Sequence, residues 1–106
     1  MRLKDKVAIV TGGGVGIGKA IALAFAREGV SVVAASRNLS NLESVVNQIK
    51  DSGGRATAIQ TDISDEKQVQ RMVAQTLAEY GHVDILVNNS GITGATARVI
   101  DVTLDD

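Results

Sequence analysis

The chain has 106 residues and a formal net charge of −1, with 44% hydrophobic and 22% charged residues. These values are typical of one globular domain and provide no overall field to attract nucleic acid or an anionic membrane. The absence of cysteine excludes disulfides and cysteine-ligated zinc, and the single histidine, His82, argues against any metal centre. No apolar run is long enough to span a bilayer and no signal peptide is recognisable, so we expect a cytoplasmic protein.

Apolar runs of strand length alternate with longer segments of helical period, beginning with an expected strand at Val7–Val10. A glycine-rich turn follows, and then a helix that we expect to end at Gly29. Its expected apolar face contains Ile17, Ala20, Ile21, Ala24 and Phe25.

The second expected strand, Val32–Ala35, is continuously apolar, as is typical of a parallel strand covered on both faces. Ser40 is expected to begin a second helix through a capping box with Glu43, and Gly53 to end it. Its expected buried face contains Leu42, Val45, Val46 and Ile49.

A third strand is expected at Ala56–Gln60, and Ser64 or Asp65 should cap a third helix that ends at Gly81. We expect a fourth strand at Ile85–Val87, a loop from Ile92 to Arg98 and the first turn of a helix over 103–106. The third helix has an apolar stripe formed by Val69, Met72, Val73, Thr76, Leu77 and Tyr80.

This alternation predicts an α/β protein: the first half of a Rossmann-type doubly wound parallel sheet, in β-α-β-α-β-α-β sequence. Right-handed crossovers between the strands predict the strand order 3-2-1-4. A fifth strand would normally flank the fourth, so we expect the far edge of the fourth strand to be bare.

The glycine-rich segment TGGGVGIG, residues 11–18, lies between the first strand and the first helix. Gly12 permits a sharp turn, Gly16 permits close approach of the backbone to a diphosphate, and Gly18 lets the helix pack tightly on the sheet. Free N–H groups and the positive end of the helix dipole would stabilise the phosphates. The alternative is a turn that only packs the helix against the strand.

Three motifs occur in the order found in classical short-chain dehydrogenases/reductases: T-G-x-x-x-G-x-G at 11–18, Asp62-Ile63, and N-N-S-G at 88–91. The chain resembles this family from Leu3 to Asp106, and particularly its 3-oxoacyl-(acyl-carrier-protein) reductases and its gluconate or glucose dehydrogenases. Ser90 stands where the family usually has alanine.

The resemblance implies that Asp62 accepts a hydrogen bond from the adenine amino group and that Ile63 adds a backbone contact. It also implies that Asn89 presents its backbone to the cofactor and that Gly91 gives close access. Asp62 could instead only begin the turn before the third helix, and asparagines after a strand are often turn residues. The loop residues expected to bind the cofactor are Gly12, Gly14, Val15, Gly16, Ile17 and Gly18, while Thr11 and Asn88 are expected to brace the sheet.

The end of the second strand bears on the choice between NAD and NADP. An NAD enzyme places an acid there to bind the ribose hydroxyls, and that acid would repel a 2′-phosphate. Here the positions are Ser36, Arg37 and Asn38, and the nearest acid, Glu43, is expected inside the second helix. A guanidinium can pair with the phosphate and a hydroxyl can add a hydrogen bond, so we predict NADP(H). NAD(H) is the alternative if Arg37 is an ordinary solvated charge.

In the family, a hydride passes between the nicotinamide and a carbonyl or alcohol carbon, with catalytic asparagine, serine, tyrosine and lysine. The tyrosine and lysine form Y-x-x-x-K, but the only tyrosine here, Tyr80, is followed four residues later by Asp84 and is expected in the core. The catalytic residues are therefore expected beyond Asp106. His82 and the acids Asp101, Asp105 and Asp106 are expected to be solvated, which leaves no metal site.

The resulting expectation is that residues 1–106 form the NADP(H)-binding N-terminal part of a single Rossmann domain, truncated before its catalytic segment and inactive alone. The full-length parent would act on a small carbonyl or alcohol substrate and form a homo-oligomer, with no nucleic-acid or membrane partner. The alternatives are a non-catalytic dinucleotide-binding module, completed by a partner or a second copy, an inactive fragment, or an NAD-dependent alcohol dehydrogenase.

Overall fold

The computed structural model of the chain describes residues 4–12, 16–88 and 98–101. Apolar strand runs and amphipathic helical segments alternate along it, and the elements lie close to their expected positions. They are β1 (Val7–Thr11), α1 (Gly16–Arg27), β2 (Ser31–Ser36), α2 (Leu39–Asp51), β3 (Ala56–Gln60), α3 (Glu66–Tyr80), β4 (Ile85–Asn88) and β5 (Arg98–Asp101).

The strands form one sheet in the order β3-β2-β1-β4-β5. The first four strands are parallel, which confirms the predicted order 3-2-1-4. On β1, Ala8 is paired in register with Val32 of β2 and Ile85 of β4, so β1 lies in the middle of the parallel part.

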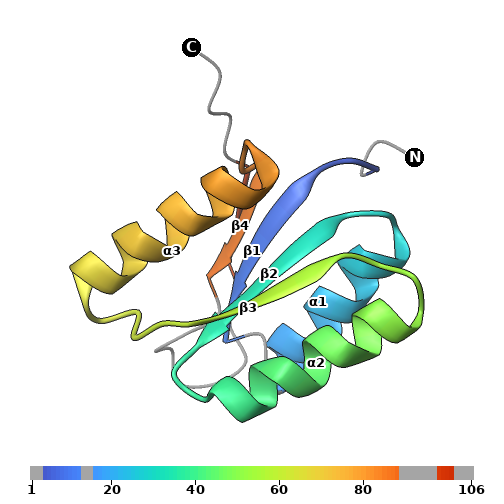
Figure 1. Cartoon of the computed structure of the whole chain (residues 1–106), viewed down its shortest axis with the longest axis horizontal. Coiled ribbons are helices and arrows are strands. Elements are labelled where there is room, and N and C mark those ends of the chain that lie inside the picture. Colours follow the sequence, from blue (N-terminus) through green and yellow to red (C-terminus); the bar gives the residue numbers. More distant parts are fainter. Residues whose placement is uncertain (1–3, 13–15, 89–97, 102–106) are drawn as a thin grey trace.

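Helices cover both faces of the sheet (Figure 1), with α1 and α2 on one face and α3 on the other. Successive side chains of a strand point to opposite faces. On β1, Ala8 and Val10 pack in the cluster with α1 and α2, whereas Ile9 packs in the cluster with α3. This two-sided burial explains why β1 and β2 are continuously apolar.

The edge of β4 differs from the expectation, because β5 pairs with it in antiparallel orientation. Asn88 is in register with Arg98, and Ile85 with Asp101. The prediction of a bare edge on β4 is therefore wrong. The expected loop from Ile92 to Arg98 is wrong at Arg98, which begins β5, and its other residues lie outside the described ones. An unpaired strand edge exposes backbone donors and acceptors, and the β-branched pair Val99-Ile100 has the propensity to satisfy them as a strand. The expected helical turn over 103–106 lies outside the described residues.

The helix α1 has the expected period but a different buried face. Gly18 and Ala22 are buried, and Ile21, Phe25 and Ala26 pack partly buried beside them. The prediction is wrong for three residues of the expected face, because they are exposed: Ile17, Ala20 and Ala24. Burying the two small residues lets the helix axis lie closer to the sheet than a row of larger side chains would.

The N-cap of α2 lies two residues before the expected Ser40, so the assignment of Ser40 as its cap is wrong. Asn38 is the N-cap, with φ −96° and ψ 95°, and its side chain accepts a hydrogen bond from the Asn41 N–H at 3.1 Å. The Ser40 hydroxyl instead donates to the Asn38 side-chain oxygen at 3.0 Å. The predicted buried face of α2 is confirmed at all four positions: Leu42, Val45, Val46 and Ile49.

The helix α3 is capped by Asp65, one of the two expected residues, whose carboxylate accepts from the Lys67 and Gln68 N–H groups. Gly81 ends it in the left-handed conformation, with φ +88°. Of the predicted stripe, Met72 and Thr76 are buried, Leu77 is exposed, and the remaining members are half-buried: Val69, Val73 and Tyr80.

Candidate functional site

The candidate site lies at the carboxyl ends of the parallel strands. Strand β1 has β2 on one side and β4 on the other; α1, which connects β1 to β2, lies on one face of the sheet, and α3, which connects β3 to β4, lies on the other. In open α/β sheets, such a point of reversal leaves a crevice outside the strand ends where ligands bind. The residues predicted to bind a cofactor follow β1, β2, β3 and β4, so the topology brings these strand ends to this edge.

Two described glycines of the segment after β1 have a backbone that favours glycine. Gly12 has φ +67° and its N–H donates to the Ala35 carbonyl oxygen at 2.7 Å, which joins the turn to the end of β2. Gly16, with φ +59°, is the first residue of α1. A left-handed backbone is costly for residues that have a Cβ, so these two positions favour glycine. Gly14 and Val15 lie outside the described residues.

The amino end of α1 faces this edge because the helix begins only a few residues after β1. Its first turn contains no acidic side chain, so nothing in that turn neutralises the positive end of the helix dipole. Ile17 is 39% exposed in this turn and is available for contact with a ligand, whereas Gly18 is buried against the sheet.

The end of β2 presents a cation. Ser36 is half-buried and its Oγ accepts a hydrogen bond from the Asn38 N–H at 3.3 Å, while Arg37 is exposed. Among residues 4–12 and 16–88, no carboxylate oxygen lies within 4.0 Å of the Arg37 guanidinium. Asn38 is occupied by its capping role in α2, so its side-chain oxygen is already an acceptor.

The end of β3 is joined to the same edge, because the buried Thr61 donates its N–H to the Ser36 carbonyl oxygen at 2.7 Å. Asp62 follows, and its Oδ1 accepts from the Ser64 hydroxyl at 2.6 Å and the Ser64 N–H at 3.0 Å. These bonds, with a smaller contribution from the charge of Arg37, lower the pKa of Asp62 below its ordinary value of 3.8. Asp62 does therefore take part in the turn before α3, and its carboxylate is held in the charged form. Ile63 is half-buried beside it.

A brace joins β1 to β4 at this edge, as expected for Thr11 and Asn88. The Thr11 hydroxyl lies 3.2 Å from both the Val87 carbonyl oxygen and the Asn88 Oδ1. Asn89 and Gly91 lie outside the described residues.

One further residue at this edge, Gln60, was not among the predicted site residues. Its Nε2 donates to the Arg37 carbonyl oxygen at 3.0 Å, across 23 residues of sequence. A polar residue at the end of a strand is unremarkable in sequence, and only the pairing of β3 with β2 places Gln60 opposite Ser36.

The matching family model is that of short chain dehydrogenases, and it covers residues 6–106. The chain belongs to the short-chain dehydrogenase family. The chain is 47% identical over 94 residues to the short-chain dehydrogenase/reductase homolog YusS of Bacillus subtilis, covering 88% of this chain and 86% of that relative. It is 40% identical to the 3-oxoacyl-(acyl-carrier-protein) reductase FabG of Thermotoga maritima, covering 88% of this chain and 38% of the reductase.

Solved structures of short-chain dehydrogenases share this fold. A 7α-hydroxysteroid dehydrogenase complexed with NADH and 7-oxo glycochenodeoxycholic acid superposes with a TM-score of 0.84 at 43% identity. The match covers 87% of this chain and 36% of that one. The chain spans between 35% and 38% of the length of the first curated relatives that it matches.

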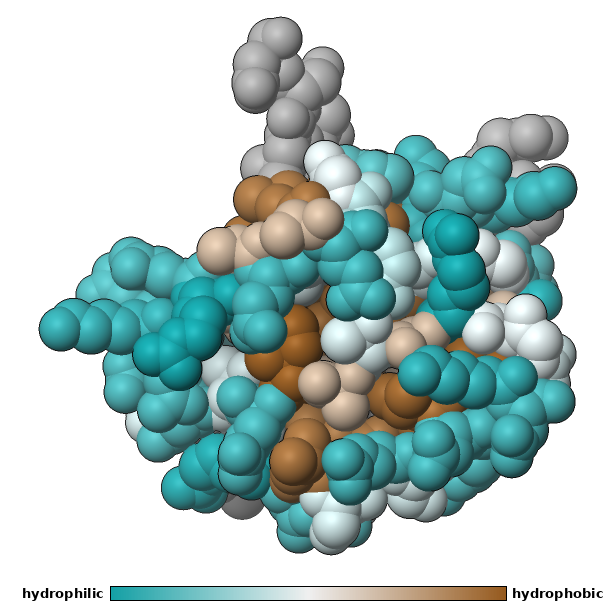
Figure 2. All heavy atoms as spheres, viewed as in Figure 1, coloured by the Kyte–Doolittle hydropathy of each residue, from teal (hydrophilic) through white to brown (hydrophobic). Residues whose placement is uncertain are grey.

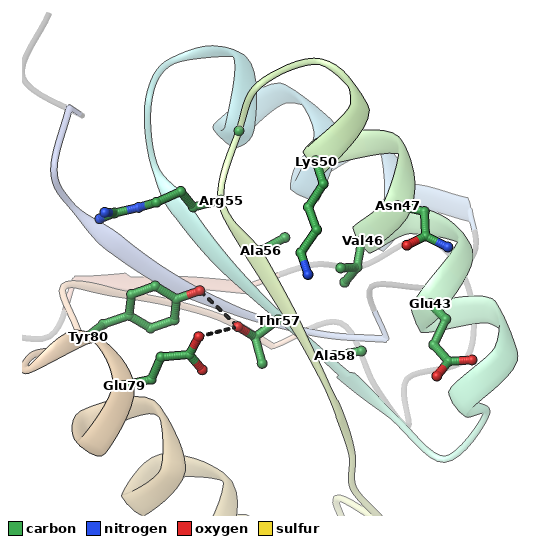
Figure 3. Close-up of a pocket in the computed structure, with 11 residues that line it drawn as sticks. Glu43, Val46, Asn47, Lys50, Arg55, Ala56, Thr57, Ala58, Glu79 and Tyr80 are labelled. Atoms are coloured by element: carbon green, nitrogen blue, oxygen red, sulfur yellow. Dashed lines mark hydrogen bonds between the residues drawn. The ribbon is translucent and has the colours of Figure 1, made fainter.

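A hollow of about 840 Å³ lies away from the strand ends, along β3 between α2 and α3 (Figure 3). Thr57 hydrogen-bonds there to the Tyr80 hydroxyl at 2.8 Å and to Glu79 at 3.0 Å. Figure 2 shows hydrophobic surface in this region with hydrophilic side chains around it. None of the predicted site residues lines it. Tyr80 is half-buried and packs beside the α3 cluster, in keeping with the predicted core position.

A smaller apolar pocket of about 240 Å³ lies between α3 and the strands β1 and β4, and Ile63 reaches it from the site edge. Among residues 4–12 and 16–88, no group of three acidic or histidine side chains is placed to hold a metal ion. No helix within the described ranges combines the length and apolar character needed to cross a membrane.

Proposed function

We propose that this chain binds NADP(H) across the carboxyl ends of β1, β2 and β3. The observation that carries the proposal is the end of β2, where Arg37 offers an exposed guanidinium and no acid occupies the neighbouring positions 36 and 38. A carboxylate at that point would repel a 2′-phosphate, whereas a guanidinium can bind it through two parallel hydrogen bonds. The complex of the related hydroxysteroid dehydrogenase with NADH supports a nicotinamide dinucleotide as the ligand class.

Each part of the edge has a role in this proposal. The turn from Gly12 to Gly18 and the amino end of α1 bind the diphosphate through backbone N–H groups. Ser36 and Arg37 bind the 2′-phosphate, and the charged Asp62 accepts a hydrogen bond from the adenine amino group. The exposed side chain of Ile17 contacts the cofactor, Asn38 anchors α2 beneath the ribose, Ile63 adds a backbone contact, and Asn89 and Gly91 complete the site after β4.

We further propose that the chain is the cofactor-binding part of an oxidoreductase that transfers a hydride between nicotinamide and a carbonyl or alcohol carbon. The parent would take a small carbonyl or alcohol substrate and assemble as a homo-oligomer. Tyr80 does not serve as the acid/base, because its hydroxyl is bonded to Thr57 beside β3 and Asp84 stands where a lysine would be needed. The 106 residues should therefore bind cofactor without turning it over.

The test is a fluorescence titration of the purified chain with NADPH and with NADH. We expect NADPH to bind more tightly, and Arg37→Asp to weaken NADPH binding by about 10- to 100-fold, because a charge-assisted hydrogen bond contributes about 1.5–3 kcal/mol. NADH binding should change little or improve. The matched control is Arg71→Asp, a charge reversal at an exposed position on α3. Tighter binding of NADH by the unmodified chain would favour the NAD-dependent alternative.

A second candidate is a non-catalytic dinucleotide-binding module completed by a partner or a second copy. The observation that favours it is the match to YusS, of which this chain covers 86%. Saturable NADPH binding by a chain that melts cooperatively, without oxidation of NADPH by any added carbonyl compound, is the result expected of a module. Loss of a cooperative melt would instead indicate an inactive fragment.

A further inference from the structure

Gln60 connects the ends of β2 and β3 through a side chain rather than through the backbone ladder. It is the last residue of β3 and is paired in register with Ser36, the last residue of β2. Its side chain is exposed, and its Nε2 donates to the Arg37 carbonyl oxygen at 3.0 Å. An exposed glutamine loses rotamer freedom when it makes such a bond, so the bond adds little to stability and its main effect is on geometry.

The residues on either side of Arg37 are fixed by other bonds. The Ser36 carbonyl oxygen accepts from the Thr61 N–H at 2.7 Å, and the Asn38 side chain caps α2. Arg37 is the residue at which the chain leaves the strand for the helix, and the bond from Gln60 fixes the peptide plane that follows it. The orientation of that plane sets the direction in which the Arg37 side chain leaves the backbone.

We propose that Gln60 is a positioning residue for cofactor selectivity, which holds the Arg37 main chain so that the guanidinium stands beside the ribose 2′-phosphate. The inference rests on the proposed function. A cofactor without that phosphate makes no use of Arg37, so the bond from Gln60 affects NADP(H) and not NAD(H). Preorganisation of the cation lowers the ordering cost of binding, which is how a residue that does not touch the ligand changes its affinity.

Asp62 gives the bond a second consequence. Its carboxylate accepts two hydrogen bonds from Ser64, and the charge of Arg37 also lowers its pKa, to a smaller extent. An Arg37 released from Gln60 would be drawn towards that carboxylate and away from the phosphate, because opposite charges at short range attract. The bond from Gln60 thus keeps apart the two groups that recognise the adenine and the phosphate.

The experiment compares Gln60→Met, which keeps the length of the side chain and removes the donor, with the control Gln75→Met at an exposed position on α3. Dissociation constants are measured for NADPH and NADH, and for adenosine 2′,5′-bisphosphate and AMP as smaller probes. We expect Gln60→Met to weaken binding of both 2′-phosphorylated ligands about three- to tenfold and to change the other two less than twofold. The melting temperature should not change. Gln60→Glu places an acceptor opposite the Arg37 carbonyl oxygen and adds negative charge, so it should weaken binding of the two 2′-phosphorylated ligands further.

A double-mutant cycle separates this positioning role from a structural one. In an Arg37→Met background, Gln60→Met should have no further effect on either phosphorylated ligand, because the cation that it positions is gone. If the unmodified chain does not prefer NADPH, the proposed function fails and the inference fails with it. If the chain prefers NADPH through Arg37 but Gln60→Met leaves the ratio of the NADPH and NADH dissociation constants unchanged, only the inference fails. The same holds if Gln60→Met weakens NADPH binding equally in the Arg37→Met background.

Discussion

At the amino ends of the strands, charged side chains bind the backbone and one another, whereas at the carboxyl ends the strands are joined by main-chain groups and uncharged side chains. Asp84 donates its N–H to the Val7 carbonyl oxygen at 2.9 Å and accepts the Val7 N–H at its Oδ2 at 2.8 Å. The same Oδ2 lies 3.0 Å from His82 Nε2, so the imidazole has a partner within the protein. His82 is exposed, as expected. At the other end, Gly12 and Thr61 join the strands through their N–H groups, and Arg37 keeps an exposed cation.

This difference assigns separate tasks to the two ends of one sheet. A charged side chain that is paired within the protein contributes to stability and interacts only weakly with a ligand. An exposed charged side chain beside the glycine turn contributes little to stability. Substitutions at the amino end should therefore change the free energy of unfolding and leave NADPH affinity alone. Substitutions at the carboxyl end should change NADPH affinity, and those that do not strain the backbone should leave the free energy of unfolding alone.

The largest effect on stability should come from Asp84→Ala. Removing the carboxylate leaves the Val7 N–H, in a buried strand, without this acceptor, and an unsatisfied buried donor costs about 1–3 kcal/mol. Denaturant unfolding should show this loss while NADPH titration shows no change. Asp84→Asn, which keeps a side-chain oxygen, should cost less. His82→Ala should cost about 0–1 kcal/mol, because the His82 side chain is exposed. If Asp84→Ala lowers NADPH affinity while the fold stays intact, the assignment of separate tasks to the two ends of the sheet is contradicted.

A smaller effect is expected from a matched pair of glycines with positive φ. Gly16 (φ +59°) begins α1 at the site, and Gly81 (φ +88°) ends α3 near the opposite end, and a Cβ at either would meet no atom within 4 Å. Alanine at each position should therefore cost about 1–2 kcal/mol through backbone strain alone. Only Gly16→Ala should also weaken NADPH binding, because the diphosphate must approach the backbone there. Equal affinities for the two variants would contradict the assignment of the diphosphate to this turn.

The smallest effect concerns the ionisation of Asp62. The Ser64 hydroxyl and N–H, and then the charge of Arg37, lower the pKa of Asp62 in the folded chain. The stability that this provides is present above pH 3.8, the ordinary value, and is lost as the pH falls through the lowered pKa, since the unfolded chain then binds the proton more readily. An NMR titration should show the pKa rising towards 3.8 in Ser64→Ala, and rising less in Arg37→Met. A larger rise of the Asp62 pKa in Arg37→Met than in Ser64→Ala would contradict the conclusion that Ser64 lowers this pKa more than Arg37 does.

Sequence reasoning succeeded where large side chains or glycine constrain the backbone. The four apolar residues of α2 leave a single face to bury, and the bounds of β3 match the expected Ala56–Gln60. The glycine turn and Arg37 were found because their residue types follow directly from the chemistry of phosphate binding. The roles assigned to them stay predictions until a ligand is titrated.

It failed where several residues of one kind compete or where the contact is distant. In α1, small residues surround the helix, so the period did not fix which face is buried, and Ala22 rather than Ala20 lies inside. Asn38, Ser40 and Asn41 are all of residue types that are favoured at helix N-caps, and only the backbone angles identify Asn38 as the N-cap. The pairing of β5 and the bond made by Gln60 depend on register between segments far apart in sequence, which periodicity does not report.

The antiparallel β5 has a consequence for how the sheet can grow. A strand with a neighbour on each side has no backbone groups left for a third, so β4 cannot template the addition of another chain while β5 is in place. A parallel strand arriving at β4 would have to displace β5 by strand exchange, opening the four-residue ladder from Ile85–Asp101 to Asn88–Arg98 as it forms its own. The last described strand thus occupies the edge of β4 at which another strand would otherwise pair.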